Sequence, residues 1–232
     1  MDPIVFVPGL LCTGALFGPQ LDVLSDRADC MIADHTGHDS MEAIAKSVLE
    51  AAPDRFVLAG LSMGGYIALE MAEMAPGRIS SLVLLDTSAR PEHPDQTEFR
   101  RKTIALAEEQ GIGAAVERLL PLFIDATRMQ DAELVAVVYK MAEDTGVATF
   151  IRQQTAIMGR RDARPNLAKV TAPTLVIVGD RDRLTPPDHS AEIAAGIPDA
   201  RLVTIAECGH LTTLERPEAV NDALLDFLNA AG

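Results

Sequence analysis

Tryptophan is absent from this sequence, aromatic residues make up only 4% of it, and 20 basic residues face 34 acidic ones. The shortage of aromatic side chains predicts a core built from aliphatic residues. The formal net charge of −14 gives a surface that phosphate groups would repel. We therefore expect neither nucleic acid nor an anionic membrane as a partner, although an acidic surface identifies no substrate.

Cysteine is scarce as well, and neither cysteine nor histidine is spaced like a metal site. Cys12, Cys30 and Cys208 are odd in number and lack the paired spacing of zinc ligands, which favours reduced thiols over a disulfide framework. The histidines form no HExxH pattern; they are His35, His38, His93, His189 and His210. The sequence predicts no metal and no other cofactor.

The N-terminus lacks the features of a secretory signal. Met1-Asp2-Pro3 carries no basic side chain, and the apolar stretch at residues 4–7 is too short for a signal or a membrane span. With 232 residues, of which 48% are hydrophobic and 23% charged, the chain resembles one globular domain, with or without an insertion. We expect a cytoplasmic protein that is a monomer or a homodimer.

Short apolar runs alternate with helical patterns along most of the chain, which is typical of a parallel sheet with crossover helices. Most of the runs show no polar alternation, as expected for strands buried on both faces. The expected strands are Ile4–Val7, Cys30–Asp34, Phe56–Gly60, Ser81–Asp86, Thr174–Gly179 and Arg201–Ile205. The expected helices are Leu16–Ser25, Met41–Ala51, Met63–Ala75, Pro187–Ala195 and Pro217–Ala230.

This alternation stops between residues 90 and 165, where several helical patterns follow one another. The expected helices there are Thr97–Gln110, Ala114–Leu120, Ala132–Glu143 and Thr149–Met158. Open α/β sheets bind ligands at the carboxyl ends of their strands, so an inserted helical block predicts a lid over that edge. The alternative is that these helices only pack on the side of the sheet. We expect a core of residues 1–89 and 166–232 and a lid of residues 90–165.

The segment Gly60-Leu61-Ser62-Met63-Gly64 follows an apolar run and precedes a helical pattern. Gly-x-Ser-x-Gly is the nucleophile elbow, in which a tight strand-to-helix turn lifts the serine hydroxyl clear of the sheet. The next helix points its N-terminus at the site and favours developing negative charge. A phosphate-binding loop is disfavoured, because neither Gly-Lys-Ser/Thr nor GxGxxG is present. The pattern predicts Ser62 as a nucleophile.

A serine hydroxyl is a weak nucleophile and needs a base, which in turn needs an acid to orient it. His210 lies between the last expected strand and the last expected helix, where the base of such a fold falls. Three aspartates follow apolar runs and compete as the acid: Asp86, Asp180 and Asp182. The chain order serine, aspartate, histidine matches α/β-hydrolases rather than the common proteases.

With these motifs the chain resembles, over nearly its whole length, the lid-bearing α/β-hydrolase superfamily of carboxylesterases, enol-lactonases and acyl-carrier methyl-ester esterases. The family's Gly-x-x-Asp-x-x-x-Pro segment is matched by Gly179, Asp182 and Pro186, so the resemblance implies Asp182 as the acid. Its Gly-His and Glu-x-Pro segments are matched at His210 and Glu215. The resemblance also implies an α/β fold with a mostly parallel sheet of about six to seven strands and helices on both faces. The family's N-terminal hairpin is missing here.

A tetrahedral intermediate needs two backbone N–H groups aimed at its oxygen. The Met63 amide, directly after the nucleophile, is one. The resemblance implies the Leu10 amide as the other, in Pro8-Gly9-Leu10, where proline replaces the family's usual histidine. The expected pocket residues lie next to these motifs or in the lid; they are Leu11, Cys12, Leu119, Phe123, Tyr139, Met158 and Leu211.

These residues predict a serine hydrolase that cleaves small, largely apolar carboxylic esters through an acyl-enzyme on Ser62. Thioesters, lactones and carbon–carbon bonds stay open as alternatives because the same machinery cleaves them and the fold does not choose. Dehalogenase and epoxide hydrolase chemistry is disfavoured, since it needs an aspartate where Ser62 stands. The alternative from another class is a non-catalytic ligand receptor on the same scaffold.

Overall fold

Six strands form one parallel sheet in the computed structural model, which describes residues 1–231. The strands are β1 (Ile4–Val7), β2 (Cys30–Ile32), β3 (Phe56–Leu61), β4 (Ile79–Leu85), β5 (Thr174–Gly179) and β6 (Arg201–Ile205). Their order in space is β2-β1-β3-β4-β5-β6, and every pairing is parallel. Six strands agree with the lower end of the expected range of about six to seven.

The inner strands are buried on both faces, as their continuous apolar sequences predict. Every residue of β1, β3 and β5 is buried, whereas β6 lies at the edge of the sheet and exposes Leu202. The strand expected to run to Asp34 ends at Ile32. Beyond that point the chain turns toward the loop after β1, where the His35 ring contacts the carbonyl of Gly9.

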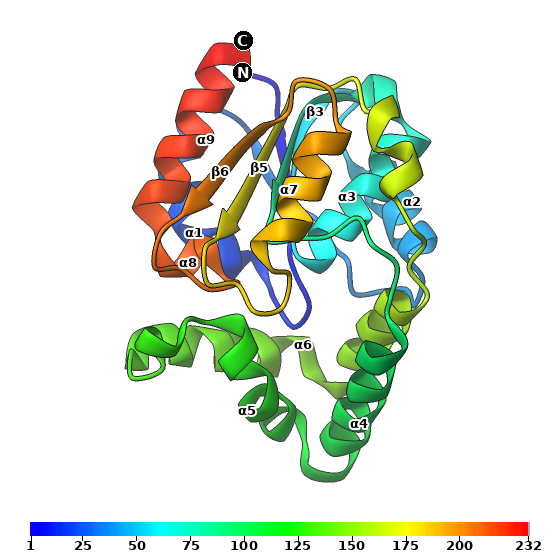
Figure 1. The fold of residues 1–232 in the computed structure, drawn as a ribbon, viewed down its shortest axis with the longest axis vertical. Coiled ribbons are helices and arrows are strands. Elements are labelled where there is room, and N and C mark those ends of the chain that lie inside the picture. Colours follow the sequence, from blue (N-terminus) through cyan, green and yellow to red (C-terminus); the bar gives the residue numbers. More distant parts are fainter. Residues whose placement is uncertain (232) are drawn as a thin grey trace.

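Helices cover both faces of the sheet (Figure 1). One face carries α1 (Gly18–Leu24) and α9 (Pro217–Ala231), and the other carries α2 (Met41–Ala51), α3 (Met63–Met74) and α7 (Pro187–Gly196). A right-handed crossover places its helix on a face that depends on which way the chain moves along the sheet. The chain moves toward one edge from β1 to β2 and toward the other edge from β3 to β4, so α1 and α3 lie on opposite faces. A short helix, α8 (Thr212–Glu215), and 3₁₀ turns at Gly14–Phe17 (η1), Pro76–Arg78 (η2), Ala126–Arg128 (η3) and Arg164–Lys169 (η4) complete the connections.

The strand order reverses direction between β1 and β3. From β1 the chain proceeds to β2 on one side, and from β3 it proceeds to β4 on the other. The loops that leave two such neighbouring strands diverge, and the crevice between them is where open α/β sheets bind ligands. Here those loops are the one that begins at Pro8 and the turn that holds Ser62.

Three helices between β4 and β5 form the α4–α6 segment: α4 (Pro94–Gln110), α5 (Ile112–Phe123) and α6 (Ala132–Met158). Figure 1 shows this segment beyond the carboxyl ends of the strands. Across residues 1–231, no helix is both long and apolar enough to cross a membrane.

The α4–α6 segment differs from the sequence expectation at Pro121 and agrees with it at Gly146. Pro121, expected between helices, lies inside α5. It is tolerated because it is exposed and the carbonyl it would have bonded belongs to Glu117, which is also exposed. The two helices expected between 132 and 158 are confirmed: Gly146, with φ 72° and ψ 166°, is not helical and separates them at a kink within α6.

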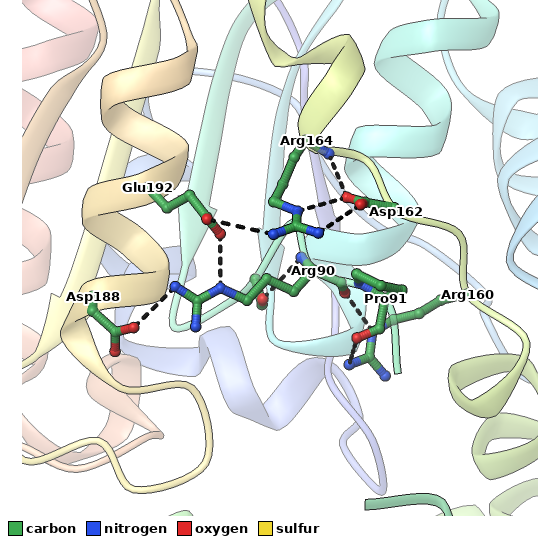
Figure 2. A network of polar contacts seen from close by, with 8 residues as sticks. Arg90, Pro91, Arg160, Asp162, Arg164, Asp188 and Glu192 are labelled. Carbon is green, nitrogen blue, oxygen red and sulfur yellow. Dashed lines mark hydrogen bonds and ion pairs between the residues drawn. The ribbon is translucent and has the colours of Figure 1, made fainter. Parts of the chain in front are cut away.

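Two connecting stretches join the α4–α6 segment to the sheet, one after β4 and one before β5. Arg160 donates from Nε to the carbonyl of Arg90 and from Nη2 to the carbonyl of Pro91 (Figure 2). Arg90 in turn bridges Asp188 and Glu192 of α7. This network therefore connects both stretches to α7, which packs on the sheet.

Candidate active site

The turn between β3 and α3 holds Ser62 in a strained conformation. Ser62 has φ 56° and ψ −115°, in the left-handed range of φ that residues other than glycine rarely adopt. A Cβ on Gly64 would overlap the carbonyl of Val7, and a Cβ on Gly60 would overlap the backbone of Gly64. Two glycines therefore allow the chain to cross closely on either side of the serine, which is the geometry of a nucleophile elbow.

His210 and Asp182 meet from the loops after β6 and β5. His210 Nδ1 lies 2.8 Å from Asp182 Oδ2, and both side chains are buried. Asp182 also accepts hydrogen bonds from the N–H groups of Leu184 and Thr185 and from the Thr185 hydroxyl. Burial raises the pKa of Asp182, but the charge and hydrogen bond of His210 and the Thr185 bonds outweigh it, and the net pKa is lowered. An ionised Asp182 holds the imidazole proton on Nδ1 and leaves Nε2 able to accept another.

The second ring nitrogen of His210 has no partner. Nε2 is buried and makes no hydrogen bond to any residue within 1–231, Ser62 included. The ring of Phe123 in α5 stacks on the imidazole, with 6.3 Å between centroids and 21° between planes. A buried nitrogen left unpaired is unfavourable for a purely structural histidine. The arrangement leaves a basic nitrogen available at the carboxyl edge of the sheet.

The other candidate acids do not contact His210. Asp86 is fully buried and accepts hydrogen bonds from the Gly179 amide and the Thr212 hydroxyl. Burial, followed by the nearby charge of Asp182, raises the pKa of Asp86 well above its ordinary value. Asp180 is exposed and accepts from the Cys208 amide. Among the three aspartates, Asp182 alone bonds to the imidazole.

The loop after β1 packs directly on the nucleophile turn. A Cβ on Gly9 would lie 3.4 Å from the Ser62 Cβ. The N–H groups of Leu10 and Met63, the expected donors of an oxyanion hole, donate no main-chain hydrogen bond within the described residues. Neither amide is therefore bonded to a main-chain carbonyl. The two amides belong to the loop after β1 and to the serine turn, which pack against each other.

A cavity of about 270 Å³ lies between this loop, the loop after β5 and the α4–α6 segment. Its apolar lining is Leu10, Phe99, Leu119, Leu122, Phe123 and Leu184, and its polar lining is Asp95, Gln96, Arg100 and Arg183. Ligand sites commonly measure about 300–1,000 Å³, so this cavity suits a small molecule.

Of the expected pocket residues, Leu119 and Phe123 line this cavity together with Leu10. The remaining ones are not among its lining residues: Leu11, Cys12, Tyr139, Met158 and Leu211. The side chains of Leu11 and Leu211 are buried in the core instead.

A second cavity, of about 180 Å³, lies between α3 and the segment 160–170. Its lining includes Tyr66, Leu69 and Arg161 but none of Ser62, Asp182 and His210. The charges on its rim are largely paired, as in the ion pair of Arg161 with Glu70. The larger cavity is not lined by the three candidate catalytic residues either, but its lining includes Leu10 and Phe123, the residue that stacks on His210, which makes it the better candidate for a substrate site.

All three cysteines are free thiols. Cys12 is buried, its thiol donates to the Leu10 carbonyl, and burial raises its pKa to about 12. Burial likewise raises the pKa of Cys208. Thiols with raised pKa values are poor nucleophiles at neutral pH. No group of three or more His, Cys, Asp or Glu side chains in residues 1–231 is arranged to hold a metal ion.

Two supporting residues escaped the sequence analysis. Thr185 holds the Asp182 carboxylate through both its amide and its hydroxyl, and a threonine three residues after a loop aspartate could have suggested this. Gln153 of α6 accepts a hydrogen bond from the Leu11 amide. No sequence signal pointed to Gln153, because it lies 142 positions from its partner.

The chain is similar to known proteins over nearly its whole length. Residues 4–223 match the model described as the alpha/beta hydrolase family. The chain is 31% identical over 252 residues to a putative non-heme bromoperoxidase of Mycobacterium tuberculosis, with 97% of this chain and 93% of that protein covered. It is 30% identical over 244 residues to a putative carbamate hydrolase of Azorhizobium caulinodans, with 97% and 90% covered.

Among solved structures, the fold is similar to a thermophilic esterase from Thermogutta terrifontis. The TM-score is 0.90 at 27% sequence identity, and the match covers 100% of this chain and 90% of the esterase. The names of these three proteins differ in chemistry, so the likeness alone assigns no substrate.

Proposed function

This chain belongs to the alpha/beta hydrolase family, and on that premise we propose that it is a serine carboxylesterase for small, largely apolar esters. The observation that carries the proposal is the state of His210. Its Nδ1 lies 2.8 Å from the Asp182 carboxylate, while Nε2 is buried without a partner. An imidazole held in this way can take the proton of a serine hydroxyl.

The proposed reaction proceeds through an acyl-enzyme. Ser62 Oγ attacks the ester carbonyl carbon while His210 Nε2 takes the hydroxyl proton, and Asp182 stabilises the imidazolium. The amides of Leu10 and Met63 hold the oxyanion. The tetrahedral intermediate collapses, and the alcohol leaves with the proton from His210. Water then attacks the acyl group with His210 again as base, which releases the acid and restores the hydroxyl.

The missing hydrogen bond between Ser62 and His210 is compatible with this mechanism. Catalytic hydrogen bonds in ligand-free sites are often long and shorten when substrate binds. The ring of Phe123, stacked on the imidazole, limits how far the histidine can move away. We expect substrate in the cavity to bring the hydroxyl and Nε2 together.

The substrate class follows from the cavity and its wall. The α4–α6 segment supplies Leu119, Leu122 and Phe123 to a space of about 270 Å³. Apolar walls favour an apolar acyl group, and the volume favours a short one. In this proposal the segment acts as a lid that covers the ester and excludes water.

Thioesters, lactones and carbon–carbon bonds remain as alternative substrates, and the similarity to a putative carbamate hydrolase adds carbamates. All of them pass through attack of the same hydroxyl on a carbonyl. A panel of p-nitrophenyl esters of graded acyl length, beside matched thioesters, lactones and carbamates, separates these classes. We expect the highest kcat/KM for a short acyl ester. A preference for any other class would overturn the esterase assignment while leaving the nucleophile in place.

Fluorophosphonate labelling tests the nucleophile itself. We expect rapid labelling of the wild-type protein and none of Ser62→Ala. Ser88→Ala is the matched control, because Ser88 is also buried but bonds only to the nearby Arg90 amide. A folded wild-type protein that resists labelling would favour the non-catalytic receptor and overturn the proposal.

A further inference from the structure

The loop that carries the Leu10 amide is held by a residue of the α4–α6 segment. The N–H of Leu11 donates to Gln153 Oε1 at 3.0 Å. Leu11 has φ 60°, which a leucine rarely adopts and keeps only when its surroundings enforce it. Pro8, Gly9 and Leu10 have no polar side chains, so the loop depends on polar groups from elsewhere in the chain.

The orientation of the Gln153 amide follows from its two contacts. Leu11 N–H requires an oxygen, so Oε1 faces the loop and Nε2 faces His35 Nε2 at a distance of 3.0 Å. Burial lowers the pKa of His35, and a neutral ring can accept the amide proton on Nε2. The same ring nitrogen lies 3.1 Å from the Gly9 carbonyl, to which it donates instead in the other neutral tautomer. Gln153 and His35 thus contact the loop at Leu11 and at Gly9.

Burial makes this contact costly to lose. Gln153 and His35 are 0% and 3% exposed, so neither can exchange its partner for bulk water. A buried polar group without a partner is unfavourable, which keeps the glutamine bonded to the loop. Gln153 therefore holds the peptide between Leu10 and Leu11, and His35 contacts the preceding peptide, between Gly9 and Leu10.

We propose that Gln153 is a positioning residue of the oxyanion hole, which it sets by holding Leu11 so that the neighbouring Leu10 amide faces the developing oxyanion. This inference rests on the proposed serine hydrolase function. Gln153 touches neither substrate nor reacting atoms and acts through the loop. It also couples the α4–α6 segment to the rate of the chemical step, since α6 must stay in place for the hole to be complete.

The chain offers a closely matched control. Gln154 lies next along α6, is also 0% exposed, and accepts a hydrogen bond from Arg100 rather than from the loop. Gln153→Met and Gln154→Met each remove one buried amide of the same helix. We expect Gln153→Met to lower kcat on a short p-nitrophenyl ester by about 10- to 100-fold with KM little changed, since the loss of one oxyanion donor costs about 100- to 1,000-fold. Gln154→Met should keep kcat within the same order of magnitude.

A second variant separates positioning from stability. In Gln153→Glu a carboxylate oxygen can still accept from the Leu11 amide, so we expect kcat between those of the wild type and Gln153→Met. Hydrogen exchange of the Leu11 amide should be faster in Gln153→Met than in the wild type and unchanged in Gln154→Met. This rescue and local opening would not accompany a general loss of stability, which melting temperatures measure in parallel.

The outcomes distinguish this inference from the proposed function. A wild-type protein that neither labels nor hydrolyses esters overturns both. An active wild type with equal kcat losses in Gln153→Met and Gln154→Met, or with Leu11 exchange unchanged, overturns the positioning role alone. Should Gln153→Met fail to fold, Gln153→Glu decides: a kcat loss of about 100-fold or more, while Leu11 exchange stays as slow as in the wild type, counts against the proposal.

Discussion

The carboxyl edge of the sheet and the α4–α6 segment both face the candidate site, but they are held differently. The edge is fixed by main-chain hydrogen bonds that continue past the strand ends. Ser62 N–H donates to the Leu85 carbonyl and Asp86 N–H to the Ile177 carbonyl, each at 2.9 Å. The α4–α6 segment meets the site mainly through side chains, such as the ring of Phe123.

This difference indicates which part of the site sets the rate of reaction and which part sets stability and substrate preference. A strand end in a parallel ladder cannot move without breaking several hydrogen bonds together, so groups placed there keep the accuracy that bond chemistry needs. Side-chain contacts can be lost one at a time. We therefore expect substitutions at the sheet edge to change kcat, and substitutions in the α4–α6 segment, apart from Gln153, to change stability or substrate preference.

The largest effect is expected at the acid. Asp182→Asn keeps the shape of the side chain but removes the charge that holds the His210 proton on Nδ1, and we expect kcat to fall by about 10,000-fold. Asp180→Asn, at an exposed aspartate two residues away, is the control and should retain kcat of wild-type order. Steady-state kinetics on one ester checks both. A larger loss at position 180 would show that the acid was assigned wrongly.

The next effect concerns how the α4–α6 segment is attached. Glu92 lies between Arg100 and Arg160, and these three side chains are 4%, 10% and 7% exposed. Glu92→Leu leaves two buried guanidinium groups without their shared carboxylate, so we expect the free energy of unfolding to fall by about 3–5 kcal/mol. Urea unfolding measures it. The exposed pair Lys140–Asp144 is the comparison, and Asp144→Leu should cost at most about 1 kcal/mol.

A smaller effect should appear in substrate preference. Leu122 is half-buried and lines the larger cavity, so Leu122→Phe reduces the space for an acyl chain. We expect kcat/KM for a hexanoate ester to fall by about 10-fold relative to an acetate ester, as one misfit group in an apolar pocket costs about 1–3 kcal/mol. Leu225→Phe, at a half-buried leucine of α9, should leave this ratio unchanged. Equal ratios in the two variants would place the acyl group elsewhere.

The smallest effect is a change in pH dependence. Because burial raises the pKa of Asp86, the folded state holds a proton that the unfolded state releases, and stability falls as pH rises from about 4 toward the raised pKa. Asp86→Asn lacks this proton. Its stability relative to wild type should therefore increase across that window, by up to about 1.4 kcal/mol per pH unit. Urea unfolding at several pH values tests this, and a constant difference would contradict it.

Much of the fold was predictable because it is encoded locally. Continuous apolar runs placed all six strands to within a few residues, and the Gly-x-Ser-x-Gly turn predicted the strained conformation that Ser62 adopts. The helix boundaries of the α4–α6 segment were less predictable. Pro121 is harmless on an exposed face, so α5 continues to Phe123, whereas Gly146 separates the two expected helices at a kink.

The site was predictable only in part. Sequence reasoning and family resemblance selected Asp182 from three aspartates, and the structure then placed it against His210. Gln153 and Gln154 are identical neighbours in the sequence, yet they contact different segments of the chain. Nothing local distinguishes the two, because their partners lie far away along the chain.

By itself the sequence determined which segments form strands and where the serine turn falls, since these depend on neighbouring residues. Tertiary structure decided which acid meets the histidine, which glutamine holds the loop after β1 and which apolar side chains enclose the cavity. The physical reason is distance along the chain. Strand and turn formation depend on residues a few positions apart, whereas these contacts join groups that only the packing of sheet and helices brings together.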